Sequence, residues 1–419
     1  MTTTATTARE RMLLAQSAAR SIGLLSDADK RAALLAIADA IEESSGDVVA
    51  ANAEDLERGR SGGLSVALQD RLRLDAPRVA ALASAVRDIA ELPDPVGRVL
   101  DERTLPNGVE LTKVSVPFGV VGSIYEARPN VTVDIAALAL RAGNAVVLRG
   151  GSAAELTNAA LVRAMREALA SRGIDPEAIQ TVDEFGRDGA RELMQARGIV
   201  DVLVPRGSAQ LIETVVTESS VPVIETGAGV VHIVLDESAP LEWARDIVVN
   251  AKVQRPSVCN SVETVLVHRA AAERLVPPVV AALRAQGVTV HGDPDVVRLD
   301  DGVLAATEDD WSTEYLSLDI AMRVVDDLDE ALDHIRRYST HHTESIITQD
   351  DANSERFLAE VDSAVVMVNT STRFTDGGEF GFGAEVGIST QKLHARGPMG
   401  LAELTSTKWL ARGFGQVRS

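Results

Sequence analysis

The feature that most limits the possible folds of this sequence is an alternation of short apolar runs with longer helix-like segments. The runs DVLVP (201–205), VHIVLD (231–236) and VETVLVH (262–268) are almost continuously apolar and rich in valine. Such runs are typical of strands buried on both faces, as in parallel sheets whose connections are helices. The sequence therefore predicts an α/β fold built on parallel strands.

The same alternation predicts more than one domain. A second α/β unit is expected to begin near Val231, with further strands in AMRVVD (321–326), ESIITQD (344–350) and AVVMVN (364–369). The length of 419 residues suits two or three domains, each with its own core.

One segment departs from the parallel pattern. Asn107-Gly108 lies between two extended-looking stretches in 104–116, which is the strongest short-range indication of a β-hairpin. A hairpin in an otherwise parallel chain is often an arm, and with the terminal segment 405–419 it is expected to form a subunit contact.

Composition excludes several classes of partner. The formal net charge of −21 argues against nucleic acid and against anionic membrane surfaces. The N-terminal stretch MTTTATTARERMLLAQ has no apolar run long enough for a signal peptide or a membrane span. A single cysteine excludes an internal disulfide, so a cytoplasmic location with no membrane partner is expected.

That cysteine, Cys259 in KVQRPSVCNSVE, has two interpretations. A lone cysteine is usually a small buried hydrophobe. Cationic neighbours such as Lys252 and Arg255 favour a nucleophilic thiolate instead, and Pro256 indicates a loop. These residues leave both interpretations open.

Other segments indicate binding. No G-x-G-x-x-G opens a helix after a strand, but the turns RGGS (149–152) and PRGS (205–208) each direct backbone N–H groups and an arginine toward an anion. Taken alone, a plain connecting turn is the more common explanation of each of them. The glycine- and phenylalanine-containing stretch 368–400 is interpreted as an ordered binding loop, and His341, His342 and Glu344 lack the second cluster that a metal site needs.

Long segments of the chain resemble one known family. VPFGVVGSIYEARPNVTVDIAALALRAGNAVVLRGG, VPVIETGAG, QRPSVCNSVETVLVH, VDDLDEALDHIRRYSTHHTESI and FTDGGEFGFGAEVGISTQKLHARGPMGL are similar to γ-glutamyl phosphate reductases, a family of the aldehyde dehydrogenase superfamily. The resemblance runs in order from about residue 5 to the C-terminus.

The resemblance implies an aldehyde dehydrogenase-like fold of two parallel α/β domains plus a β-hairpin oligomerisation arm. The expected cofactor domain is 1–101 and 116–233, with its segment 373–400 returning to the active site. The expected catalytic domain is 234–372, and the expected arm is 102–115 and 401–419. It also implies NADPH-dependent reduction of L-glutamyl 5-phosphate to L-glutamate 5-semialdehyde and phosphate through a cysteine thioester, the second step of proline biosynthesis. A homo-oligomer is expected, and contact with glutamate 5-kinase is left open.

Residue by residue, the resemblance makes Cys259 the nucleophile and Asn130 the amide that holds the oxyanion. Glu225 occupies the place of the general base of hydrolytic relatives. The remaining expected sites are the cofactor contacts Arg149, Arg206, Gly207, Ser208 and Glu314, and the cations for the phosphate and the substrate carboxylate, Arg128, Lys252, Arg255, Arg373, Lys392, His394 and Arg396.

Two alternative functions remain open at this point. A hydrolytic aldehyde dehydrogenase would release a free acid from the thioester, and its turnover would not need phosphate. A non-catalytic relative would keep the fold alone, although Cys259 and Asn130 argue against it.

Overall fold

The computed structural model describes residues 7–126 and 128–418, which form two compact units. Unit 1 comprises the described residues of 1–225, 382–387 and 399–419, and unit 2 comprises 226–381 and 388–398. Residues 1–6 and Ala127 of the expected cofactor domain, and Ser419 of the expected arm, lie outside the described part of the chain.

Unit 1 is built on a four-stranded parallel sheet with the order β5-β4-β3-β6. All six residues of β3 are buried, as expected for a strand covered on both faces. The strands are β3 (Val120–Tyr125), β4 (Ala145–Arg149), β5 (Ile179–Thr181) and β6 (Val202–Arg206).

The helices of unit 1 surround this sheet. α6 and α7 connect its strands and pack against α2 and α5, while α1 packs along β4 and β5. Side-chain caps fix the starts of two helices, because Thr7 accepts from Glu10 N and Ser26 accepts from Asp29 N. The helices are α1 (Ala8–Ile22), α2 (Asp27–Glu43), α3 (Ser45–Ser61), α4 (Val66–Leu72), α5 (Ala76–Glu91), α6 (Pro129–Arg141), α7 (Glu155–Ser171), α8 (Gly186–Met194) and α9 (Ala209–Glu218).

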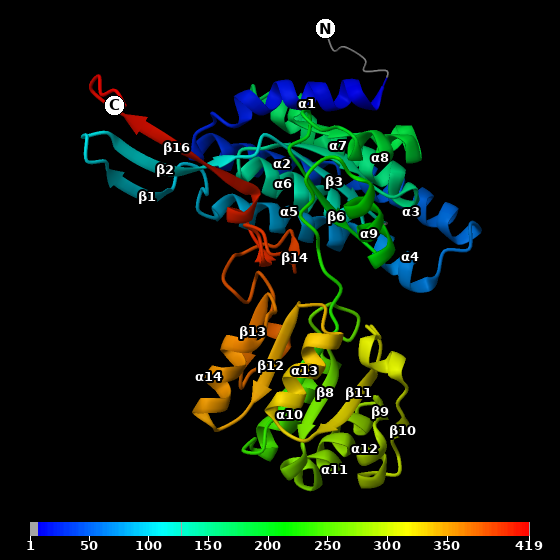
Figure 1. Ribbon diagram of the computed structural model, residues 1–419. Coiled ribbons are helices and arrows are strands. Elements are labelled where there is room, and N and C mark those ends of the chain that lie inside the picture. The colour runs from blue at the N-terminus through cyan, green and yellow to red at the C-terminus, as the bar shows by residue number, and fades with distance from the viewer. Residues whose placement is uncertain (1–6, 127, 419) are drawn as a thin grey trace. The chain divides into compact units, whose positions relative to one another are not determined.

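A separate three-stranded antiparallel sheet extends from unit 1, with the order β1-β2-β16 (Figure 1). β1 (Val99–Thr104) and β2 (Glu110–Pro117) form the predicted hairpin, and Gly108 takes the left-handed φ of 84° that its turn needs. β16 (Thr405–Arg412) pairs with β2, so the two segments expected to form an arm do lie in one sheet.

Unit 2 is built on a seven-stranded parallel sheet with the order β10-β9-β11-β8-β7-β12-β13. Its neighbouring strands pair in parallel, which confirms the predicted second α/β unit. The strands are β7 (Val231–Leu235), β8 (Val262–His268), β9 (Thr289–Gly292), β10 (Leu304–Ala305), β11 (Asp319–Val325), β12 (Thr343–Ile347) and β13 (Val365–Val368).

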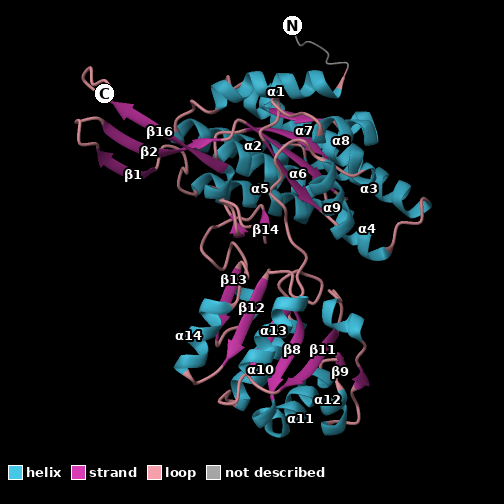
Figure 2. Cartoon of the chain, in the orientation of Figure 1, coloured by secondary structure: helices cyan, strands magenta, loops and turns pink. Residues whose placement is uncertain are grey.

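Helices cover both faces of this sheet (Figure 2). One apolar core packs α10, α11 and α12 on the strands, and a second packs α13 and α14 on the opposite side chains of the same strands. The helices are α10 (Leu241–Val253), α11 (Arg269–Ala285), α12 (Pro294–Leu299), α13 (Leu328–Tyr338) and α14 (Asp351–Glu360).

The observed boundary between the units corrects the expected one. The expected division at 233/234 falls inside β7, whereas the chain divides at 225/226 because β7 is a central strand of the second sheet. Most of 373–400 also belongs to unit 2, and within this segment β14 (Gly387–Ser389) pairs with β15 (Gly397–Met399). Within the described residues, no helix combines the length and the apolar composition needed to cross a bilayer.

Candidate active site

Three segments meet at the amino edge of the sheet of unit 2. Cys259 lies in the loop between α10 and β8, Gly229 lies just before β7, and Glu314 lies before β11. β11, β8 and β7 are neighbours and run parallel, so the residues that precede them gather at the same edge. Cys259 is half-buried there.

Backbone contacts join these three segments. The amide of Gly229 donates to Oε1 of Glu314 at 2.7 Å. A Cβ atom built on Gly229 would lie 1.5 Å from the carbonyl oxygen of Cys259, so only glycine allows this approach. Burial raises the pKa of Glu314, and the bond from Gly229 acts against that rise. Glu314 is therefore held beside the backbone that carries the cysteine.

The residues next to Cys259 anchor its loop. Asn260 donates from Nδ2 to the carbonyl of Thr375 at 2.7 Å, and its own carbonyl accepts from Oγ1 of Thr372 at 2.8 Å. Ser261 donates to the carbonyl of Ala251 in α10 at 3.2 Å. Thr372 and Thr375 belong to the segment predicted as a binding loop, and this part of that segment is ordered against the cysteine loop.

The guanidinium of Arg373 lies near the thiol of Cys259, and Arg255 lies near Arg373. Arg373 donates from Nε to Oε1 of Gln254 at 2.9 Å. Burial and the nearby Arg255 lower the pKa of Arg373, while Asp376 and Cys259 act in the opposite sense. Since arginine stays charged in proteins, the cysteine has a fixed cation beside it, which favours its thiolate.

The structure corrects the expectation for Lys252. Its side chain is fully buried, and its Nζ lies 2.6 Å from Oε2 of Glu263. A buried ammonium paired with a carboxylate has no path to a substrate phosphate, so Lys252 is not one of the substrate cations.

The last three expected cations lie on the segment that follows β14. Lys392 and Arg396 both pair with Asp362, Arg396 at 2.9 Å. His394 is exposed. Lys392 and Arg396 thus balance the carboxylate of Asp362 in unit 2.

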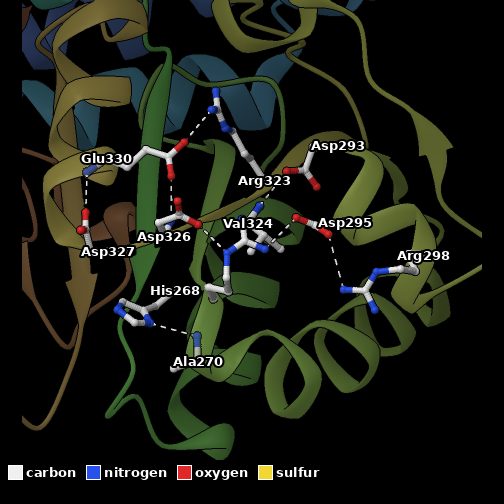
Figure 3. A network of polar contacts seen from close by, with 11 residues as sticks. His268, Ala270, Asp293, Asp295, Arg298, Arg323, Val324, Asp326, Asp327 and Glu330 are labelled. Carbon is white, nitrogen blue, oxygen red and sulfur yellow. Dashed lines mark hydrogen bonds and ion pairs between the residues drawn. The ribbon is translucent and has the colours of Figure 1, made fainter.

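The opposite, carboxyl edge of the same sheet carries a polar network that stabilises the fold (Figure 3). Arg269 bridges Asp295 at 2.9 Å and Asp326 at 2.5 Å, and Arg323 pairs with Glu330 at 2.7 Å. These opposite charges pair with one another, and the pairs join β8, β11, α12 and α13. We therefore assign the chemistry of unit 2 to the amino edge.

In unit 1 the candidate residues lie at the carboxyl edge of the sheet. Ser208 caps α9 and donates to Oε1 of Glu126 at 2.6 Å, and a Cβ atom at Gly207 would lie 2.9 Å from Cδ of Glu126. These turns follow β3 and β6, where the strand order reverses, which is the usual ligand site of an open parallel sheet.

The turn after β4 lies at the same carboxyl edge of the sheet of unit 1. The guanidinium of Arg149 donates to the carbonyl of Gly150 at 2.9 Å, and the Gly150 amide donates to Oδ1 of Asp183 at 2.6 Å. A cavity of about 420 Å³ lies beside the turn and is lined by Arg58, Gly59, Gly62, Leu64, Ser152, Ala153 and Glu155. Close-packed glycine turns, a cavity and nearby arginines suit a dinucleotide with its phosphates.

The remaining expected residues of unit 1 lie near the start of α6 and at the end of the unit. Asn130 donates from Nδ2 to Oδ2 of Asp134 at 3.1 Å, which orients its amide. Burial raises the pKa of Asp134 to about 6. Arg128 occupies the N-cap of α6, and Glu225 is half-buried in the segment between α9 and β7.

Sequence reasoning missed Gly229 and Glu263 as site residues. Gly229 stands in GAGVVH, where no residue spacing predicts a contact with Cys259, and Glu263 stands four residues after Cys259 with no spacing that predicts its partner. Within 7–126 and 128–418, no group of three His, Cys, Asp or Glu side chains is arranged to hold a metal ion.

Comparison with known proteins gives a consistent result. Residues 1–298 match the model of the aldehyde dehydrogenase family. The chain is 63% identical over 418 residues to a γ-glutamyl phosphate reductase from Leifsonia xyli, covering 100% of this chain and 99% of the relative. It is 57% identical to one from Thermobifida fusca, covering 96% and 97% of the two chains.

Solved structures extend the comparison to the fold. The crystal structure of a γ-glutamyl phosphate reductase from Thermotoga maritima matches with a TM-score of 0.96 at 43% identity, over 98% of this chain and 99% of that one. An acetylating aldehyde dehydrogenase from Geobacillus thermoglucosidasius matches with a TM-score of 0.69 at 18% identity, over 98% and 97%. The second likeness concerns the fold alone.

Proposed function

Because the chain belongs to the aldehyde dehydrogenase family, among its γ-glutamyl phosphate reductases, we propose that it reduces L-glutamyl 5-phosphate to L-glutamate 5-semialdehyde and phosphate with NADPH. The observation that carries this proposal is the single cysteine, Cys259, held in an anchored loop beside Arg373. An acyl phosphate needs a nucleophile for its carbonyl and a cation for its charged groups, and this edge offers both.

Cys259 is the proposed nucleophile. Its thiolate attacks the acyl carbonyl, the C–O bond to phosphate breaks, and phosphate leaves from a tetrahedral intermediate to give a thioester on Sγ. The nicotinamide cofactor, when bound, supplies the hydride that reduces this thioester. Collapse of the resulting thiohemiacetal breaks the C–S bond, releases the aldehyde and returns the thiolate.

Asn130 is the proposed donor to the oxyanion of each tetrahedral intermediate. Its Nδ2 carries two hydrogens, and only one is used by Asp134. One such donor lowers the barrier of acyl transfer by about 3–4 kcal/mol in other enzymes. No water has to be activated in the reductive direction, so Glu225 has no required role as a base.

Arg373 and Arg255 are the proposed contacts of the leaving phosphate, and Arg128 and His394 remain proposals for the substrate carboxylate. Arg373 is the strongest candidate because its Nε donates to Gln254, which orients its guanidinium, and because Cys259 lies close enough to act on its charge. A forked guanidinium suits a phosphate better than an ammonium does.

Most of the residues proposed to hold the cofactor lie in the turns at the carboxyl edge of unit 1, and one lies in unit 2. The turn at Arg206, Gly207 and Ser208 is proposed for the pyrophosphate, and Glu314 for the nicotinamide ribose. Arg149 at the end of β4 and Arg58, which lines the cavity after β4, are proposed to favour the extra phosphate of NADPH over NADH. These assignments rest on turn geometry, charge and the family.

The β1-β2-β16 sheet is proposed as an oligomerisation arm. β1 and β16 are edge strands of this small sheet, and Val99, Leu100 and Trp409 on it are about half exposed. Apolar side chains on a sheet with open edges favour pairing with another copy of the chain.

The test of the proposed function is the phosphate dependence of the reverse reaction. Given glutamate semialdehyde and NADP⁺, the protein is expected to form NADPH only when phosphate or arsenate is present, and Cys259→Ala is expected to abolish this turnover. NADPH formation without either anion would identify a hydrolytic dehydrogenase instead.

A further inference from the structure

A buried ion pair joins the two ends of the cysteine loop, the residues 253–262 that carry Cys259. Lys252 lies in the last turn of α10 and Glu263 is the second residue of β8, so the pair brackets residues 253–262. Nζ of Lys252 lies 2.6 Å from Oε2 of Glu263, and neither side chain has exposed surface. The ends of the loop that carries Cys259 are thus joined by one interaction.

The same pair reaches the segment that carries Glu314. Oε1 of Glu263 accepts from the amide of Leu316 at 3.4 Å, and Leu316 has a left-handed φ of 54°. Nζ of Lys252 lies 5.8 Å from the centre of the Tyr315 ring. One carboxylate therefore fixes the cysteine loop with one oxygen and the Glu314 segment with the other.

Gly229 joins the cysteine loop to the Glu314 segment by direct contacts. It donates to Glu314 and packs against the carbonyl of Cys259. A change in the Lys252–Glu263 pair would thus move both sides of the contact between the cysteine loop and Glu314.

The stability of the fold does not by itself explain why these two residues form a buried ion pair. Desolvation of two charges is expensive, and well-packed apolar residues of similar size often stabilise a fold equally well or better. Burial raises the pKa of Glu263 to about 7 and lowers the pKa of Lys252, because desolvation outweighs the attraction between the two groups. What the pair provides beyond stability is a fixed geometry for two segments of the candidate active site.

We propose that Lys252 and Glu263 are positioning residues. As a pair, they hold Cys259 and Glu314 at a fixed distance and orientation relative to each other. The inference rests on the proposed function, in which Cys259 is the nucleophile and Glu314 contacts the nicotinamide ribose. Neither Lys252 nor Glu263 touches the substrate; they act through the backbone of the two segments.

The experiment compares Lys252→Met with the double variant Lys252→Met/Glu263→Leu. The single variant leaves a buried carboxylate without its cation and is expected to lower the urea midpoint, whereas the double variant removes both charges and is expected to regain most of it. If the pair positions the site, the double variant still loses about 10- to 100-fold in kcat, since a displacement of about 1 Å at a reacting group has an effect of that size.

A second measurement needs no substrate. Because Cys259 is the only cysteine, the rate of alkylation by iodoacetamide reports on this thiol alone. The double variant is expected to react about threefold or more slowly than wild type at pH 7.5, as the thiol leaves its place beside Arg373. This rate tests the positioning of the thiol even if the wild-type enzyme fails the phosphate-dependence assay, so failure of the two proposals is distinguishable.

A matched control comes from unit 1. Lys30 is also buried and pairs with Asp94 at 2.5 Å, so Lys30→Met removes a comparable cation away from the cysteine loop. It is expected to lower the urea midpoint without changing the alkylation rate. If the double Lys252/Glu263 variant recovers its stability together with wild-type kcat and alkylation rate, the pair is only structural and the proposal is wrong.

Discussion

Gly229 packs so closely on Cys259 that a Cβ atom at position 229 would lie 1.5 Å from the cysteine carbonyl oxygen. The same glycine donates its amide to Glu314 at 2.7 Å. A single residue without a side chain thus sets both the distance to the proposed nucleophile and the position of the proposed cofactor contact.

The first prediction concerns Gly229→Ala. The added methyl group must displace the backbone of Cys259, and we expect kcat to fall about 100-fold and the free energy of unfolding to fall by about 1–3 kcal/mol. Steady-state kinetics and urea unfolding measure these effects. Gly46→Ala is the control, because a Cβ at Gly46 meets no atom within 4 Å and alanine favours the α3 helix by about 0.5–1 kcal/mol. Unchanged kinetics in Gly229→Ala would contradict the contact.

The second prediction concerns Arg373. Arg373→Gln removes the cation beside Cys259, and we expect kcat/KM for the acyl phosphate to fall about 10- to 100-fold, because a hydrogen bond to a charged group contributes about 1.5–3 kcal/mol. Arg373→Lys should recover only part of this loss, since an ammonium lacks the forked donors. Lys392→Gln, at an exposed lysine that pairs with Asp362, is expected to leave kcat/KM unchanged. Equal losses in both glutamine variants would mean that Arg373 has no special contact.

Much of the fold follows from the sequence because its signals are local. Apolar runs predicted β6, β7, β8, β11, β12 and β13, and Asn107-Gly108 predicted the β1–β2 hairpin. The short strands β5, β9 and β10 were missed, since three, four and two residues are too few for a recognisable apolar run. They are defined by pairing with neighbours that are distant in the sequence.

The site was less predictable because its contacts are not local. Lys252 stands among polar residues and beside the cysteine, which suggested a substrate cation, yet the turn of α10 directs it into the interior toward Glu263. Gly229 and Glu314 are 85 residues apart and meet only because β7 and β11 both flank β8. No residue spacing in the sequence predicts the contact between Gly229 and Glu314.

The third prediction concerns the β1-β2-β16 sheet. Leu100→Glu and Trp409→Glu place charge on half-exposed apolar positions of its two edge strands, and we expect either change to shift the protein to a smaller species in sedimentation velocity. Leu24→Glu is the control, because Leu24 is 87% exposed and lies outside this sheet. If the arm variants sediment as wild type does, the sheet is not the subunit contact.

The fourth prediction concerns the acid stability of unit 2. His342 is fully buried, and burial lowers its pKa to about 4, while the pKa of His334 is lowered to about 2. In the unfolded chain an imidazole binds a proton below about pH 6.5, so between pH 6.5 and pH 4 the unfolded state holds more protons than the folded state. Stability is therefore fully present above pH 6.5 and falls as the pH falls, by about 2 kcal/mol per histidine at pH 5.

Urea unfolding at pH 7.5 and pH 5, followed by tryptophan fluorescence, measures this loss, because Trp311 is buried in unit 2 with its ring centre 5.6 Å from that of His334. His342→Asn has no titrating ring and keeps polar atoms that can bond Thr343, so its stability should depend less on pH, by about 2 kcal/mol over this interval. His341→Asn, at an exposed position whose φ of 60° asparagine tolerates, should keep the wild-type pH dependence. A wild-type slope in His342→Asn would mean that the buried imidazole is not what makes unit 2 sensitive to acid.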